Sequence, residues 1–140
     1  MATIYVDIVS TEESLYSGEA KCVFAPASRG EIGVYPRHTA LLSTLKPGEV
    51  RVETEQGEES IYVSGGIIEV QPEVVTIFSD TAIRAHDLDE ARALEAKQRA
   101  EEAMANATGD QEIGATQAAL AEAMAQLQMI SKMRGKKIKG

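Results

Sequence analysis

The pattern of hydrophobic and polar positions changes once along the chain, near residue 86. Before that point short apolar runs alternate with turn-forming residues, and every proline lies at or before Pro72. After it alanine dominates, with long polar side chains between, and no valine follows Val75. Because valine favours strands and alanine is the best helix former, this pattern predicts a β domain over residues 1–86 and a helical domain over residues 87–140.

The first part of the chain carries a series of short runs with strand character. They cover residues 3–9, 20–25, 31–35, 40–45, 50–54, 60–64, 67–70 and 74–78. Turn signals such as Pro47-Gly48 and Gly65-Gly66 separate many of them. Many short strands with frequent turns are typical of an antiparallel sandwich or barrel, so we expect an N-terminal antiparallel β-sandwich.

Residues 87–140 repeat apolar side chains at spacings of three and four, which is the period of an amphipathic helix. The first stripe is Ala93, Ala96, Ala100, Ala103 and Ala107, and the second is Ile113, Thr116, Leu120, Ala123, Leu127 and Ile130. Asp87 and Glu90 have the spacing of a capping box. Gly109 is expected to close the first helix and Asp110 to cap the second. The prediction is a C-terminal antiparallel two-helix hairpin.

Alanine along one side of this hairpin predicts a thin contact between the helices. A buried methylene contributes only about 0.8 kcal/mol, so a stripe of methyl groups stabilises far less than a stripe of leucines. The residues alone leave two interpretations open. Either the helices separate at low cost, or tight alanine packing keeps the hairpin permanently closed.

Charge is distributed unevenly over a chain whose formal net charge is −8. The last nine residues contain no acidic residue and five basic ones: Lys132, Arg134, Lys136, Lys137 and Lys139. An acidic body with a basic tip argues against general nucleic-acid binding and favours a tip that meets an acidic partner. The alternative is a solvated tail whose charges favour the helix dipole.

Groups that carry catalytic chemistry are scarce. His38 and His86 are the only histidines, and the chain has no cluster with metal-ligand spacing, no phosphate-cradling glycine loop and no nucleophile elbow. We therefore expect no metal and no enzymatic activity. Cys22, the only cysteine, lies in an apolar run and is expected to be a buried, inert thiol. No apolar run reaches the length of a membrane span, so we expect a soluble protein.

Residues 29–43 form a stretch that is a candidate for a functional surface. It bends at Gly30, Gly33 and Pro36 and carries Glu31, Arg37 and His38. A rigid loop that presents charges suits a docking surface, whereas the simpler interpretation is a structural turn with incidental charges.

The residues of this stretch resemble the signature of the epsilon subunit of bacterial F-type ATP synthases. The resemblance lies in Gly30-Glu-Ile-Gly33, Pro36, His38 and Leu41-Leu42, and continues in order through residues 62–70, 80–83 and 87–93. The family usually has a proline where this chain has Ala40. The resemblance implies a β-sandwich of about ten strands followed by a helical hairpin.

The same resemblance implies a non-catalytic rotor subunit in the central stalk of a proton-translocating ATP synthase. Such a subunit couples rotation to ATP synthesis and attaches to the gamma subunit and to the polar loops of the c-ring. The loop with Glu31, Arg37 and His38 matches the region of those contacts. The expected location is peripheral, on the cytoplasmic face of the bacterial inner membrane.

Inhibition of ATP hydrolysis is the second implied activity. In the family the hairpin opens as a mobile regulatory arm, and basic side chains of its last helix meet an acidic loop of the beta subunits. The residues with the right sign and place here are Lys132, Arg134, Lys136, Lys137 and Lys139.

A regulatory ATP is the only cofactor that the resemblance raises. Leu88, Asp89, Arg92 and Ala93 match a nucleotide-binding motif of some members, and Arg99 could add charge. The alternative is that Asp89 and Arg92 form a plain helix pair, and Glu122 on the second helix would repel phosphates.

Two other functions remain as alternatives. One is a free-standing ATP-sensing hairpin protein, and the other is a generic adaptor whose sandwich and arm dock different partners. Composition alone leads only to the adaptor, whereas the family resemblance favours the rotor subunit.

Overall fold

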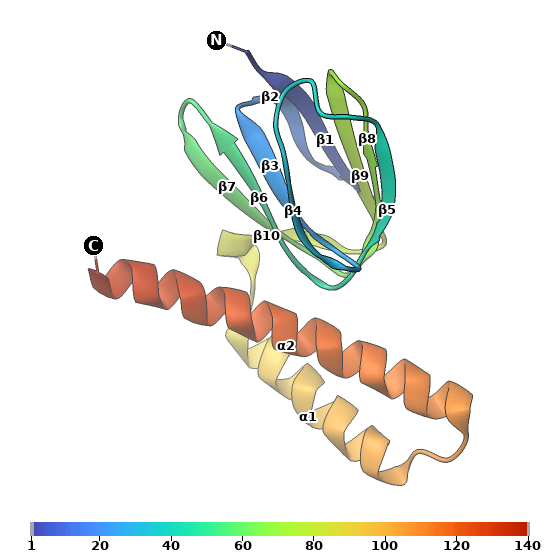
Figure 1. Cartoon of the computed structure of the whole chain (residues 1–140). Coiled ribbons are helices and arrows are strands. Elements are labelled where there is room, and N and C mark those ends of the chain that lie inside the picture. The colour runs from blue at the N-terminus through green and yellow to red at the C-terminus, as the bar shows by residue number, and fades with distance from the viewer. Residues whose placement is uncertain (1, 140) are drawn as a thin grey trace. The chain divides into compact units, whose positions relative to one another are not determined.

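A computed structural model describes the backbone of residues 2–139 and the side chains of residues 2–135. The chain divides into two compact units, Met1–His86 and Asp87–Gly140 (Figure 1). This division falls where valine-rich sequence gives way to alanine-rich sequence.

Ten strands make up the first unit, and they belong to one sheet. The strands are β1 (Ile4–Ser10), β2 (Ser14–Ala20), β3 (Cys22–Ala27), β4 (Gly30–Val34), β5 (Leu41–Leu45), β6 (Gly48–Thr54), β7 (Gly57–Val63), β8 (Gly66–Val70), β9 (Val74–Ser79) and β10 (Ala82–Arg84). Their order is β10-β7-β6-β3-β5-β8-β9-β1-β2, with β4 paired to β3 outside this path. All pairs are antiparallel except β1 with β9, which is parallel.

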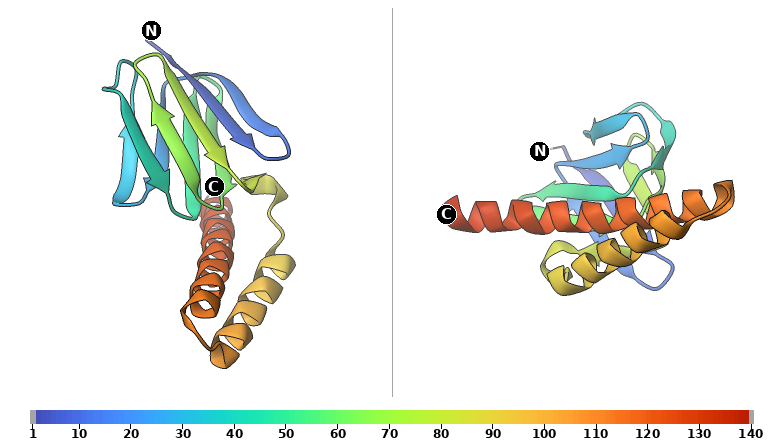
Figure 2. Two further views of the ribbon diagram at one scale, coloured as in Figure 1. Left: turned by 90° about the vertical axis from the view of Figure 1, so that its right-hand side faces the viewer. Right: turned by 90° about the horizontal axis from the view of Figure 1, so that it is seen from below.

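The sheet curls round so that its two halves face each other across the core (Figure 2). The guanidinium of Arg84 on β10 donates to the carbonyl oxygen of Leu15 on β2, at 3.1 Å. This bond joins the two ends of the strand order, so the sandwich is nearly closed. The predicted fold class, an antiparallel β-sandwich followed by a two-helix hairpin, is confirmed.

Branched aliphatic side chains fill the core of the sandwich. Ile4, Val6 and Ile8 alternate along β1 and are fully buried, as are Val50 and Val52 on β6. Alternate residues of a strand point to the same face, so one face of each strand supplies the core. Full burial of such a side chain contributes about 1.5–3 kcal/mol.

Two strands were not predicted from the sequence. The strand β2 buries only Leu15 and Ala20 and contains Gly18, so its apolar pattern is weak. The strand β10 has three residues, too few to show an alternating pattern. Both lie at the ends of the strand order, where pairing with one neighbour suffices.

The helical unit contains α1 (Glu90–Asn106) and α2 (Asp110–Lys139), which run side by side in opposite directions (Figure 1). The capping box expected at Asp87 is wrong. A short 3-10 helix, η1 (Ala85–Asp87), precedes α1 and delays its start. Asp89 is the N-cap instead, and its carboxylate accepts from the backbone N–H groups of Ala91 and Arg92.

The turn between the helices also differs from its prediction. The helix α1 ends at Asn106, before Gly109, and Ala107 caps it by donating its N–H to the carbonyl oxygen of Met104. Gly109 lies in the turn with φ of 88°, and its carbonyl accepts the N–H of Ile113 in α2. Asp110 is the first residue of α2 rather than the residue before it.

The predicted alanine stripe of α1 is partly wrong. Ala93 and Ala100 are buried, but Ala96 and Ala103 are exposed. The half-buried positions that complete the stripe are Lys97, Met104 and Ala107. The predicted stripe has spacings of three, four, three and four, whereas the observed buried face has spacings of four, three, four and three. The two therefore differ by one residue at every second position. The conclusion about its composition stands, because both buried side chains of α1 are alanine.

Two glycines with nearly the same positive φ make it possible to compare backbone strain with packing. Gly66 has φ of 129° and Gly57 has φ of 130°. A Cβ at position 66 would overlap the carbonyl oxygen of Phe78, whereas a Cβ at position 57 would meet nothing within 4 Å. We expect Gly66→Ala to lower the free energy of unfolding by about 3–5 kcal/mol, and Gly57→Ala by about 1–2 kcal/mol. Urea unfolding of both variants tests this; equal losses would contradict the packing argument.

Candidate functional site

Glu31 lies on β4 and forms an ion pair across the sheet. Its carboxylate accepts a hydrogen bond from Arg51 on β6, at 3.1 Å. The guanidinium carbon of Arg51 lies 4.5 Å from the ring centre of Phe24 on β3, which is a cation–π contact. Partial burial works to lower the pKa of Arg51, but the hydrogen bond and the charge of Glu31 outweigh it and raise that pKa. The carboxylate of Glu31 is therefore held in a fixed place on the surface.

Gly33 makes this arrangement possible. A Cβ at position 33 would lie 2.8 Å from Cε1 of Phe24, so only glycine leaves room for the ring. The ring of Tyr35 meets that of Phe24 edge to face, with centres 6.2 Å apart. The roles of Phe24, Tyr35 and Arg51 were not predicted from the sequence. These residues meet through the pairing of strands that are distant in the chain, and one sequence does not reveal that pairing.

Arg37 and His38 lie on a tight turn between β4 and β5. The N–H of His38 donates to the carbonyl oxygen of Tyr35 at 3.2 Å, and Arg37 has φ of 67°. With Pro36 at the second position, this is the pattern of a type II turn, in which the third position is usually glycine. The N–H of Arg37 also donates to the carbonyl oxygen of Pro72, at 2.8 Å. The bend expected at Pro36 is present, and the turn is tied to the β8–β9 connection.

Glu31 and the Arg37–His38 turn do not share one loop, which corrects the sequence interpretation. Glu31 pairs in register with Pro26, next to the turn at residues 28–29. Arg37 and His38 follow the other end of β4. Six residues of extended chain span about 20 Å at 3.3 Å each. The stretch is a strand that carries charged groups at its two ends.

An apolar row lies on the outer face of the sheet and was not predicted. Its members are Leu42 on β5, Ile67 on β8 and Phe78 on β9, whose exposed fractions are 69%, 49% and 50%. Ile67 pairs directly with Phe78, and Leu42 lies one diagonal step from Ile67. The solvent face of an antiparallel sheet is normally polar, so this row is a candidate interaction surface.

The basic tip is described in part. Lys132 and Arg134 are exposed on α2. The side chains of Lys136, Lys137 and Lys139 lie outside the described residues, although the backbone of α2 continues to Lys139. Arg134 forms an ion pair with Glu90 at the start of α1.

The nucleotide-binding motif forms an ordinary helix start in this conformation. The guanidinium of Arg92 lies 3.9 Å from the carboxylate of Asp89, which already caps α1. Ala93 is buried and Leu88 is half-buried. Arg99 pairs with Glu95 one turn away, at 3.7 Å. The geometry fits the helix-pair interpretation, and ATP binding stays a prediction.

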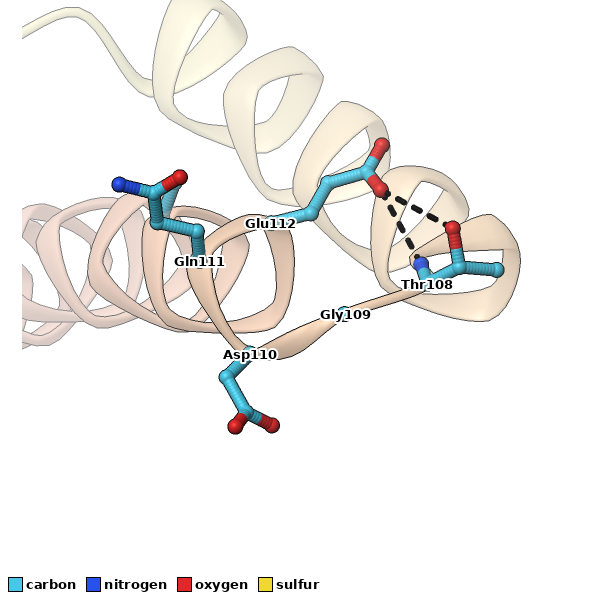
Figure 3. Close-up of a pocket in the computed structure, with 6 residues that line it drawn as sticks. Thr108, Gly109, Asp110, Gln111 and Glu112 are labelled. Carbon is cyan, nitrogen blue, oxygen red and sulfur yellow. Dashed lines mark hydrogen bonds between the residues drawn. The ribbon is translucent and has the colours of Figure 1, made fainter.

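A hollow at the hairpin turn has the wrong charge for a phosphate. It is lined by Thr108, Gly109, Asp110, Gln111, Glu112 and Ala115. The Glu112 carboxylate turns back and accepts hydrogen bonds from the N–H and the hydroxyl of Thr108 (Figure 3). Asp110 points away from this contact (Figure 3). The hollow contains two carboxylates and no basic side chain, which disfavours a bound phosphate. The contact between Glu112 and Thr108 stabilises the turn at the start of α2.

The described residues offer neither a metal-binding cluster nor a helix suited to a bilayer. These residues hold no group of three or more His, Cys, Asp or Glu side chains placed to bind a metal ion. Within the same part of the chain, neither helix combines the length and the apolar character that a bilayer crossing requires.

Cys22 is buried on β3, with 2% of its surface exposed. Its thiol donates a hydrogen bond to a carboxylate oxygen of Glu53, at 3.3 Å. Burial, together with the hydrogen bond and charge of Glu53, raises the pKa of Cys22 from 9.0 to about 11. The thiolate is the reactive form of cysteine, so this environment makes the side chain unreactive near neutral pH.

Both parts of the chain match models of one protein family. The model described as "ATP synthase, Delta/Epsilon chain, beta-sandwich domain" matches residues 3–85. The model described as "ATP synthase, Delta/Epsilon chain, long alpha-helix domain" matches residues 86–131. The chain therefore belongs to the ATP synthase delta/epsilon chain family.

Its similar relatives place it among the epsilon chains of that family. It is 75% identical over 138 residues to the ATP synthase epsilon chain of Ruthia magnifica subsp. Calyptogena magnifica, covering 99% of this chain and 100% of the relative. It is 60% identical to the ATP synthase epsilon chain of Alkalilimnicola ehrlichii, covering 96% of each. The family resemblance seen in the sequence is confirmed, and the chain is a non-catalytic, central-stalk subunit of ATP synthase.

Solved structures share the fold at low sequence identity. A chain of the Euglena gracilis mitochondrial ATP synthase, in an assembly of OSCP, F1 and c-ring, matches with a TM-score of 0.78 and 22% identity. The match covers 89% of this chain and 79% of that one. A chain of the Tetrahymena thermophila central stalk and c-ring matches with a TM-score of 0.53 and 13% identity, covering 62% and 70%.

The raised pKa of Cys22 predicts a loss of stability at high pH. Between pH 9 and 11 the folded protein keeps the thiol proton that the unfolded chain releases. The free energy of unfolding should therefore fall through this window, by about 1–3 kcal/mol. Urea unfolding at several pH values tests this, with Cys22→Ala as the control, because that variant should lose less stability over the same window. Parallel pH profiles for the two proteins would contradict the assignment.

Proposed function

We propose that this subunit couples rotation of the central stalk to ATP synthesis and restrains ATP hydrolysis through its C-terminal helices. The family match over both units supports the first part. The observation that carries the second is the composition of the hairpin, in which α1 buries only alanine and α2 ends in basic residues. Weak packing between α1 and α2 favours separation of the two helices. The basic residues at the end of α2 favour binding to an acidic surface.

We propose that the sandwich docks the gamma subunit and the polar loops of the c-ring through separate surfaces. The apolar row of Leu42, Ile67 and Phe78 suits gamma, because the centre of a stable interface is apolar and depleted of charge. The charged groups at the two ends of β4 suit polar loops and interface rims. Their separation supports contacts with two partners rather than one.

Docking through the c-ring implies a peripheral place at the membrane. In bacteria, whose epsilon chains are similar to this one, that place would be the cytoplasmic face of the inner membrane. The coupled ion expected from the resemblance is the proton.

Inhibition is proposed to act through charge at the end of α2. The open arm would bring its terminal helix to the catalytic subunits, where Lys132, Arg134, Lys136, Lys137 and Lys139 would face an acidic loop of beta. Regulatory ATP is proposed at Leu88, Asp89, Arg92 and Ala93, with Arg99. It would have to compete with the closed hairpin, where Asp89 caps α1 and Ala93 is buried. The family match favours this rotor function over a free-standing sensor or a generic adaptor.

Removal of the arm tests the inhibitory part of the proposal. A chain truncated after Asp87 keeps the whole sandwich and loses both helices. We expect the purified complex to hydrolyse ATP about fivefold faster or more, since couplings of this kind are typically worth 1–3 kcal/mol. Co-elution of the truncated chain with gamma is the control for assembly. Unchanged hydrolysis in a complex that retains the truncated chain would show that the arm does not inhibit.

Site-specific cross-linking tests the docking surfaces. Glu31→Cys and His38→Cys, each carrying a photoactivatable label, should give products with different subunits in the assembled enzyme, because β4 separates the two positions. The unmodified protein is the matched control, since its Cys22 is buried and should remain unlabelled. The same single product from both positions would argue against two separate surfaces.

A further inference from the structure

An ion pair joins the start of α1 to the end of α2. Glu90 is the first residue of α1, and Arg134 lies near the end of α2, 44 residues later. The guanidinium meets the carboxylate in a two-pronged arrangement: Nη1 donates to Oε1 at 3.2 Å, and Nη2 contacts Oε2. Arginine and carboxylate pairs of this geometry are more specific and stronger than single contacts. The other ion pairs recorded on α1, Asp89–Arg92 and Glu95–Arg99, stay within that region of one helix.

The ion pair lies at the end of the hairpin where it can most directly oppose separation of the helices. The covalent turn at residues 107–109 holds one end of the helix pair together. Glu90 and Arg134 lie at the opposite end, where the helices would begin to separate. Between the two ends, the buried side chains of α1 are Ala93 and Ala100. The helix α2 adds the buried side chains of Ala123, Met129 and Ile130. Because the alanine methyl groups of α1 contribute little, an ion pair at the free end adds to the resistance to opening.

We propose that Glu90 is a latch, which keeps the hairpin closed by occupying Arg134 and must release it before the basic tip can contact an acidic surface. This inference rests on the proposed inhibitory function for its consequence in the enzyme, but the latch itself is a property of the isolated chain. In the closed hairpin Glu90 occupies the Nη1 and Nη2 edge of the Arg134 guanidinium, so an outside carboxylate that binds this edge has to displace Glu90. An acidic surface that binds Arg134 only in the open hairpin therefore shifts the population toward the open form.

The exposure of the pair makes the latch sensitive to salt. The side chains of Arg134 and Glu90 are 62% and 35% exposed. Ions screen charges that face solvent, so the latch weakens as ionic strength rises. The alanine contacts do not weaken in this way, so we expect the loss of this ion pair to reduce the salt dependence of opening.

Opening can be measured in the full-length protein through a cysteine placed in the seam. Ala100 is buried in the closed hairpin, so a thiol in Ala100→Cys reacts with a labelling reagent only when the helices separate. Native Cys22 gives little background, since it is buried and its pKa is raised to about 11. The labelling rate then reports the open fraction even when that fraction is small.

In this background Glu90→Gln and Arg134→Gln should each raise the labelling rate about threefold. The double variant should be no faster than either single one, because both changes remove the same interaction. This cycle separates the ion pair from the effect of Glu90 on the helix dipole, which is additive. Glu95→Gln is the matched control: it removes a carboxylate and an ion pair within α1, and should leave the rate unchanged. Unchanged rates for both single variants, or strictly additive effects in the double variant, would overturn the latch.

The assembled enzyme separates the latch from the inhibitory function. Glu90→Gln frees Arg134 and should lower ATP hydrolysis, whereas Arg134→Gln opens the hairpin equally but removes a basic group, and should not lower it. Lower hydrolysis with Glu90→Gln but not with Arg134→Gln, in two variants that open alike, supports both proposals. Faster labelling with no change in hydrolysis for either variant would support the latch and overturn the inhibitory function.

Discussion

Alanine at the buried positions of α1 is the constraint on which the behaviour of this molecule depends. A core of isoleucine and valine holds the sandwich, with Ile4, Val6 and Ile8 fully buried along a single strand. The hairpin has no comparable core on α1, where Ala93 and Ala100 are the buried residues. One chain therefore combines a rigid body with an attached hairpin in which α1 buries only alanine and α2 buries Ala123, Met129 and Ile130. Polar interactions at the margins of the hairpin consequently matter more than they would in a well-packed domain.

The strand β4 organises the surface of the rigid body in a similar way. Its sequence places a carboxylate at one end and a turn with Arg37 and His38 at the other. Gly33, in its middle, admits the ring of Phe24, on which Arg51 rests while holding Glu31. Gly33, expected from the sequence at a bend of a rigid loop, lies within β4 and is required for close packing. The signature is thus a consequence of how three neighbouring strands fit together.

Much of the fold could be predicted from local patterns, because valine-rich alternation and alanine periodicity are local properties. The division near residue 86 and most strands follow from them. Local patterns failed where tertiary context decides. The strand β2 is too polar to be recognised, and Ala96 and Ala103 match the helical period yet face solvent. Asp89 caps α1 in place of Asp87 because a 3-10 turn intervenes, which no spacing rule indicates.

The candidate site was less accessible to sequence reasoning than the fold. Glu31, Arg37 and His38 were found as individual residues, but they were placed on one loop over residues 29–43, although the run predicted over residues 31–35 forms the strand β4 between them. Arg51 and Glu90 acquire their roles from partners 20 and 44 residues away. The apolar row exists only once the register of three strands is known. Contacts between residues that are far apart in the sequence depend on how the strands and helices are arranged. These contacts cannot be predicted from a single sequence.

The bond from Arg84 to the carbonyl of Leu15 has a consequence for solubility. A curled sheet with two unpaired end strands offers backbone groups on which a strand from another molecule can add, and such addition leads to aggregation. Here the guanidinium occupies a backbone acceptor of β2 and places a positive charge between β2 and β10. An incoming strand would have to displace that charge, so Arg84 opposes the addition of a further strand at this place.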